Sequence, residues 1–217
     1  MTRRLIGVLA SALLLISGVA RAQTPPANTG TTGATDLNWQ VSTNGGSSWS
    51  PALKVVNPLF STSGFIPPNW QPNTADYSWI SATTTGSGGG GNYLFRTMFS
   101  LAGFDPTSAV LSFLCVVDNL PATRQYSLNG GAYTGTCGHQ SLYDFTSTQT
   151  LASGFLAGNN ELRFHVTGDS RTDGLLVANT DLTANSTVPE PTTIALLGTG
   201  LVGIMGAVRR RRNSRLV

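Results

Sequence analysis

The chain has 217 residues, of which 40% are hydrophobic and 11% charged, and its formal net charge at pH 7 is +3. That length is enough for one domain with a buried core, and such sparse charge argues against a coiled coil or a long charged disordered chain. Residues 23–188 hold five basic and nine acidic side chains, a net charge of −4, because most basic residues lie at the two ends. The body therefore has no phosphate-binding basic patch, which argues against nucleic acid as a partner.

The N-terminal residues have the parts of a secretory signal peptide. Arg3 and Arg4 give a charged start, residues 5–20 form an apolar run, and Ala20 and Ala22 are the small residues that signal peptidase accepts. We expect cleavage after Ala22 and export of the chain. The alternative is an uncleaved membrane anchor.

The next residues are small, polar and turn-forming, so we interpret 23–35 as a flexible leader. Residues 42–49, Ser-Thr-Asn-Gly-Gly-Ser-Ser-Trp, resemble a degenerate Asp-box, a hairpin motif of sialidases and related β proteins, with Asn44 in place of the usual Asp. A stable hairpin turn explains these residues equally well. Trp49 and Trp70 lie beside turn residues, which makes them the candidate glycan contacts, whereas Trp79 is expected in the core.

Several segments of the body alternate between apolar and polar residues, and none sustains a helical apolar period. Residues 93–101 place Tyr93, Phe95, Thr97, Phe99 and Leu101 on one face. Residues 161–166 are expected to point Leu162, Phe164 and Val166 inward and Glu161, Arg163 and His165 outward. The apolar run 109–117 predicts a strand covered on both faces. The expected fold class is all-β, with a single β-sandwich or jelly-roll domain.

A family resemblance follows from the order of these features. The order of four segments resembles that in the galactose-binding-like jelly rolls. These segments are residues 104–106 (Phe-Asp-Pro), 118–119 (Asp-Asn), 128–130 (Leu-Asn-Gly) and 155–160 (Phe-Leu-Ala-Gly-Asn-Asn). The resemblance spans roughly residues 70–178. It implies a jelly roll of the kind that accompanies many glycan-active enzymes, although the fold alone does not decide function.

The body offers little for catalysis or metal binding. It contains two histidines, His139 and His165, one glutamate, Glu161, and no Gly-x-Ser-x-Gly motif. Two-carboxylate glycosidase chemistry needs a paired acid and base, and residues 137–139 (Cys-Gly-His) lack a second pair of zinc ligands. We therefore expect no enzyme activity, no metal and no cofactor. A glycan hydrolase using two aspartates is the less favoured alternative.

Cys115 and Cys137 are the only cysteines of the chain. In an exported protein such a pair suggests a disulfide that closes a loop of 22 residues. The alternative is a buried Cys115 beside a free Cys137.

The C-terminal residues have three successive parts. Val188, Pro189, Glu190 and Pro191 precede the apolar residues 192–208, and the cluster Arg209, Arg210, Arg211 and Arg212 follows. The apolar run is close to the shortest length that spans a bilayer, and the positive-inside rule places the arginines in the cytoplasm. This order resembles the PEP-CTERM protein-sorting signal. The resemblance implies recognition by an exosortase, a membrane cysteine protease, and cleavage near the Pro-Glu-Pro motif. A plain transmembrane anchor is the alternative.

Four segments are thus expected. They are a signal peptide (1–22), a flexible leader (23–35), a β-sandwich domain (36–187) and a sorting segment with a transmembrane helix (188–217). PEP-CTERM proteins are typical of Gram-negative bacteria that make biofilm and extracellular polysaccharide. We expect an exported protein, anchored in the inner membrane before processing and then placed at the cell surface or in the extracellular matrix, that contacts extracellular polysaccharide without catalysis. A purely structural or adhesive surface protein is the alternative.

Overall fold

The computed structural model describes residues 24–55, 73–86, 90–118, 124–139, 147–168, 173–187, 199–200 and 203–204. The described strands are β1 (Thr35–Ser42), β2 (Ser50–Lys54), β3 (Ile80–Ser81), β4 (Gly91–Ser100), β5 (Val110–Asp118), β6 (Arg124–Leu128), β7 (Gly138–His139), β8 (Gln149–Leu151), β9 (Asn159–Gly168) and β10 (Gly174–Thr183). A single-turn 3-10 helix, η1 (Pro106–Ser108), precedes β5. The all-β prediction is confirmed for the body.

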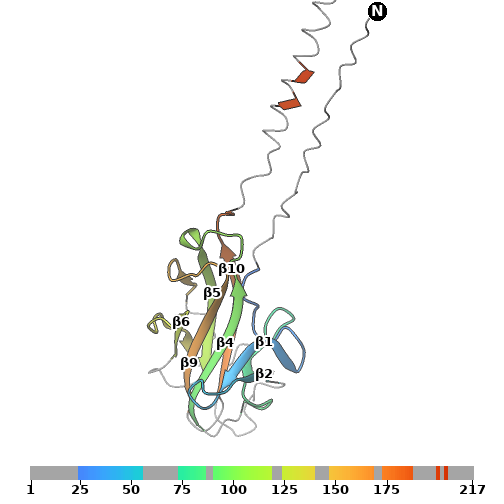
Figure 1. Cartoon of the computed structure of the whole chain (residues 1–217). Coiled ribbons are helices and arrows are strands. Elements are labelled where there is room, and N and C mark those ends of the chain that lie inside the picture. The colour runs from blue at the N-terminus through green and yellow to red at the C-terminus, as the bar shows by residue number, and fades with distance from the viewer. Residues whose placement is uncertain are drawn as a thin grey trace, which may run out of the picture. The chain divides into compact units, whose positions relative to one another are not determined.

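The strands form one continuous sheet in the order β6-β9-β4-β1-β2-β3-β10-β5-β7, with β8 also paired to β5 (Figure 1). Strands β5 and β9 are far apart in this order, yet the ring centroid of Phe113 on β5 lies 5.6 Å from that of Phe164 on β9. The same Phe113 ring lies 5.0 Å from Tyr126 on β6. The sheet therefore curls back into two packed layers, an arrangement consistent with a jelly-roll-like fold.

Alternation along β9 and along residues 95–100 of β4 builds one wall of the core. Phe95 and Phe164 are fully buried and are register partners across the two strands. The alternation predicted these inward faces, because successive side chains of a strand point to opposite sides of the sheet. The prediction is confirmed for Leu162 and Val166, which are also fully buried.

Strands β5 and β10 are buried on both faces over residues 115–118 and 174–178, so the prediction from the nearly continuous apolar run 109–117 is confirmed for the end of β5 only. In the first part of β5, Val110, Ser112 and Leu114 are partly exposed. Phe113 faces the main core, while the neighbouring Val116 belongs to a second buried cluster with Val55, Trp79 and Leu176. The fully buried Trp79 confirms the core role expected for it. This second cluster lies on the opposite face of the same strands.

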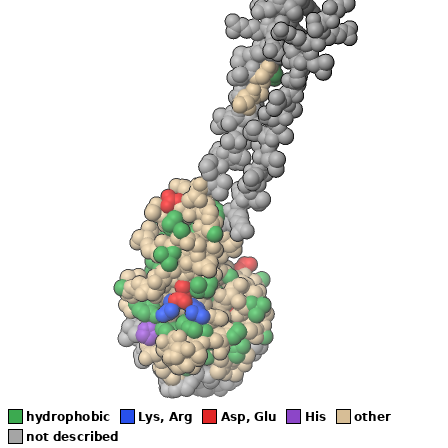
Figure 2. Space-filling model, in the orientation of Figure 1, with side chains coloured by type: hydrophobic (Ala, Val, Ile, Leu, Met, Phe, Trp, Pro, Cys, Tyr) green, Lys and Arg blue, Asp and Glu red, His purple; other side chains and the backbone are tan. Residues whose placement is uncertain are grey.

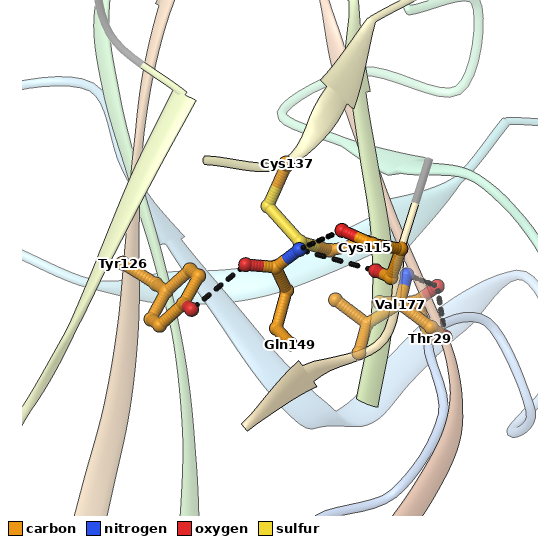
Figure 3. Close-up of a disulfide and its surroundings, with 7 residues drawn as sticks. Thr29, Cys115, Tyr126, Cys137, Gln149 and Val177 are labelled. Atoms are coloured by element: carbon orange, nitrogen blue, oxygen red, sulfur yellow. Dashed lines mark hydrogen bonds between the residues drawn. A yellow bond between two sulfur atoms is a disulfide. The ribbon is translucent and has the colours of Figure 1, made fainter. Parts of the chain in front are cut away.

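A disulfide joins Cys115 of β5 to Cys137 (Figure 3). The segment around Cys137 links the two edges of the curled sheet. Thr134 pairs with Tyr126 of β6, the Cys137 N–H donates to the Arg124 carbonyl at 2.9 Å, and β7 then pairs with β5 in parallel. Residues 134–139, which we call the closing strap, thus connect β6 to β5, and the disulfide fastens the strap to β5.

The folded body begins earlier in the chain than the composition predicts. Thr29, within the segment interpreted as a flexible leader, is fully buried. Its N–H donates to the Val177 carbonyl of β10 at 3.0 Å, and its side-chain oxygen accepts from the Val177 N–H at 3.0 Å. The Thr180 N–H donates to the Asn28 side chain at 3.1 Å. These polar residues dock through hydrogen bonds, which hydrophobic patterning does not reveal.

Residues 185–187 are the last described residues of the body, and they are hydrogen-bonded to residues 103–105. Asp105 N–H donates to the Asn185 carbonyl at 2.8 Å, and Thr187 N–H donates to the Gly103 carbonyl at 2.9 Å. In the described part of the chain, no helix is long and apolar enough to cross a membrane. The residues expected for signal cleavage, sorting and the basic stop lie outside the described residues; they are Ala20, Ala22, Val188, Pro189, Glu190, Pro191, Arg209, Arg210, Arg211 and Arg212.

Candidate functional site

The outer face of β1, β4 and β9 carries a row of polar side chains. The strand register sets Gln40 beside Arg96, and Arg96 beside Arg163. Each of the three alternates with residues that point into the core, so all three side chains project from the outside of the sheet. Adjacent strands lie about 4.8 Å apart, so the row crosses three strands over about 10 Å.

Glu161 joins the two arginines of this row. Arg96 Nη1 donates to Glu161 Oε2 at 3.2 Å, and Arg163 Nη2 pairs with Glu161 Oε1 at 2.5 Å. Arg96 Nε also donates to Gln40 Oε1 at 2.8 Å. Figure 2 shows basic side chains gathered around an acidic one on this side of the body. Both carboxylate oxygens of Glu161 are thus engaged by guanidinium groups.

Trp49 lies over this network. The guanidinium carbon of Arg96 is 4.1 Å from the Trp49 ring centroid, and that of Arg163 is 5.5 Å away. Both distances are within the range of cation–π attraction. Trp49 is partly buried, so the residue keeps some exposure to solvent. We call the side chains of Gln40, Trp49, Arg96, Glu161 and Arg163 the Trp49 face.

The turn between β1 and β2 carries Trp49 to this position. Asn44 organises the turn: its Oδ1 accepts from the Ser48 N–H at 2.9 Å and from the Ser42 hydroxyl at 2.9 Å, and its amide donates to Ser48 Oγ at 2.8 Å. Gly45 and Gly46 have φ of 71° and 91°, the left-handed region in which glycine is favoured. The residues that resemble an Asp-box therefore form the hairpin turn that supports Trp49.

A second aromatic side chain, that of Tyr133, lies beside His165 of β9. The Tyr133 ring centroid is 5.5 Å from that of His165, and His165 Nε2 lies 3.3 Å from Asn92 Oδ1. Burial lowers the pKa of His165 below its ordinary value. His165 is consequently neutral at neutral pH, and it contacts the polar Asn92 and the aromatic Tyr133 on the outer face.

Two of the asparagines quoted for the jelly-roll resemblance, Asn129 and Asn160, have structural roles. Asn160 is fully buried, where its side chain accepts from the Leu156 N–H at 2.8 Å and donates to the carbonyls of Leu156 and Gly158 at 2.9 Å. Asn129, at a φ of 52°, donates to Asn160 Oδ1 at 2.8 Å. The side chains of these two residues hold turns together.

The structure brings together only part of the residues singled out from the sequence. Trp49 lies on the polar face described above, whereas Trp70 lies outside the described residues. Patterning predicted that Glu161 and Arg163 point outward, but nothing in the sequence connected them to Trp49 or to Arg96, because that contact depends on the register of β1, β4 and β9. Within the described ranges, no three His, Cys, Asp or Glu residues gather as metal ligands.

Comparison with known proteins gives one match. Residues 187–212 match the PEP-CTERM protein-sorting motif. No curated protein and no solved structure matches the chain. The chain therefore carries a PEP-CTERM protein-sorting motif, which implies an exported protein that is anchored in the membrane and processed by an exosortase.

Proposed function

We propose that this protein, once exported and processed, resides at the cell surface or in the extracellular matrix and contacts extracellular polysaccharide through the Trp49 face, without catalysis. The sorting motif supports the export and processing. The observation that carries the contact is the position of Trp49, an aromatic ring held on the outside of a sheet among polar side chains. Sugar rings present C–H groups that suit an aromatic surface and hydroxyls that suit polar neighbours.

The side chains of the face provide both kinds of contact. Gln40 and the two arginines supply amide and guanidinium donors within one row. The arginine side chains are 26% and 28% exposed, so solvent and a surface ligand can reach them. Tyr133 adds a second aromatic ring beside His165. A surface that carries both kinds of group across three neighbouring strands fits a polymer chain that lies across the sheet.

The absence of catalysis is part of the proposal. Glu161, the one glutamate of the body, has both oxygens bonded to arginine. A glycosidase needs a second carboxyl group across the scissile bond from the first. The guanidiniums around Glu161 support a positioning role for this side chain rather than proton transfer.

The test is a binding assay with the full-length chain in mild detergent and polysaccharide extracted from the producing cells. We expect saturable binding that weakens about tenfold in Trp49→Ala, since a lost aromatic contact corresponds to roughly 1 kcal/mol or more. Leu156→Ala, which truncates a side chain that is 54% exposed on another loop, is the control and should bind normally.

Other outcomes would contradict the proposal in different ways. Self-association of the chain without any affinity for polysaccharide would favour the structural or adhesive alternative. Release of reducing sugar from the polysaccharide would show hydrolysis instead. Binding that is unchanged in Trp49→Ala would place the contact elsewhere on the molecule.

A further inference from the structure

The guanidinium groups of the Trp49 face have more hydrogen-bond donors than their neighbours accept. Each arginine has five N–H donors in a planar fork. Among the described residues, Arg96 bonds through Nε and Nη1, and Arg163 bonds through Nη2 alone. Arg163 Nε is buried without a hydrogen-bond partner in that same part of the chain. Donors therefore remain on both arginines while their side chains stay about one quarter exposed.

The charge of this face differs in sign from that of the body. Two arginines and one glutamate give the face a net charge of +1, whereas residues 23–188 carry −4. The neighbouring His165 adds no charge at neutral pH because burial lowers its pKa. The face is thus a local positive region on an acidic protein, and its charge complements an anionic group.

The geometry of the two arginines suits carboxylate or sulfate groups. A guanidinium fork matches a planar carboxylate through two parallel hydrogen bonds, and charge-assisted bonds of this kind are about twice as strong as neutral ones. Arg96 and Arg163 are direct partners on adjacent strands, and Trp49 lies over both. The stacking on Trp49 and the bonds to Glu161 hold the two forks in place before a ligand arrives, which lowers the ordering cost of binding.

From these observations we infer that the polysaccharide contacted by the Trp49 face is acidic, and that Arg96 and Arg163 bind its carboxylate or sulfate groups while Trp49 packs against a sugar ring. This inference rests on the proposed function and specifies its ligand class. Both arginines are expected to contribute, because each keeps one terminal nitrogen without a bond to a described residue, Nη2 in Arg96 and Nη1 in Arg163. Binding should weaken as salt rises, since screening reduces attraction between exposed charges.

The experiment compares the extracted polysaccharide with two chemically neutralised forms of itself, one carboxyl-reduced and one desulfated. The full-length chain is titrated with each at low and at physiological salt. We expect at least about tenfold weaker binding to one of the neutralised forms, since a charge-assisted bond to an acidic group is lost. Arg163→Gln should lose the preference for the native polymer, and Arg163→Lys should keep part of it. Lys54→Gln, which removes a basic residue of β2 outside the face, is the matched control and should keep it fully.

The outcomes separate this inference from the proposed function. Equal binding to the native and both neutralised polymers, with Trp49→Ala still weakened, would overturn the acidic ligand and leave the glycan contact standing. Absence of binding to all three would overturn both. A melting curve would show whether the Arg163→Gln variant is folded. If it is unfolded, the folded Arg96→Gln variant replaces it in the experiment. An unchanged preference of Arg96→Gln for the native polymer over its neutralised forms would overturn the inference.

Discussion

Replacing Cys115 and Cys137 with alanine would remove the covalent link between β5 and the closing strap. The disulfide closes a loop of 22 residues, and the chain-entropy model gives about 3 kcal/mol for a loop of this length. For a chain of 150–250 residues, each kcal/mol lowers the melting temperature by about 2–4 °C. We therefore expect the double variant to melt about 10 °C below the unmodified protein. Hydrogen bonds from residues 134–139 to β6 should persist, so the variant should still fold.

The assay is thermal unfolding of the full-length chain followed by circular dichroism, with and without a reducing agent. Reduction should lower the melting temperature of the unmodified protein to that of the Cys115→Ala/Cys137→Ala variant and should leave the variant unchanged. If the double variant melts within about 2 °C of the unmodified protein, less than 1 kcal/mol has been lost. The reasoning that the disulfide fastens the sheet edge would then be wrong.

Three further predictions follow from the described contacts. Gly135→Ala should lower the free energy of unfolding by more than 1 kcal/mol, because Gly135 has a φ of 67° and an added methyl group would collide with the Tyr126 ring. Denaturant titration measures this change, and an unchanged midpoint of the unfolding transition would contradict the packing of Gly135 against Tyr126. Asn44→Ala should weaken glycan binding and expose Trp49 to fluorescence quenching, since it removes the hydrogen bonds of the turn, whereas unchanged quenching would show that the turn does not hold the ring. Burial lowers the pKa of His165 in the folded state, so the unfolded chain binds more protons than the folded chain near pH 6.5, and the free energy of unfolding should fall as the pH drops below about 6.5. His165→Gln should make the free energy of unfolding depend less steeply on pH in this range. An equally steep dependence in the variant would exclude His165 as its source.

The parts of the fold that depend on local patterning could be predicted from the sequence. Alternation along 161–166 predicted that Phe164 faces the core and Arg163 faces outward. The nearly continuous apolar run 109–117 predicted a strand covered on both faces, which is confirmed for residues 115–117, whereas Val110, Ser112 and Leu114 are partly exposed. In both cases the side-chain period of a single strand carries the information.

The features that depend on contacts between distant segments could not be predicted in this way. Thr29 is buried and forms hydrogen bonds with Val177. The sequence of a segment that docks in this way, with small polar residues, cannot be distinguished from that of a flexible leader. The contact of Trp49 with Arg96 joins a turn to a strand 47 positions later, and only the register of β1 against β4 brings them together. The position of Trp49 beside turn residues indicated an exposed side chain. It did not indicate that Arg96 and Arg163 lie next to its ring.

The proposed function requires that polysaccharide occupies the outer face of β1, β4 and β9. Hydroxyl-radical footprinting of the full-length chain, with and without the extracted polysaccharide, tests it most directly, because Trp, Met, Tyr and His side chains are oxidised in proportion to their exposure. We expect polysaccharide to protect Trp49, Tyr133 and the 55% exposed Met98. Oxidation of Tyr77, which packs against the second buried cluster, should stay unchanged. Protection of Tyr77 without protection of Trp49 would contradict the proposed function.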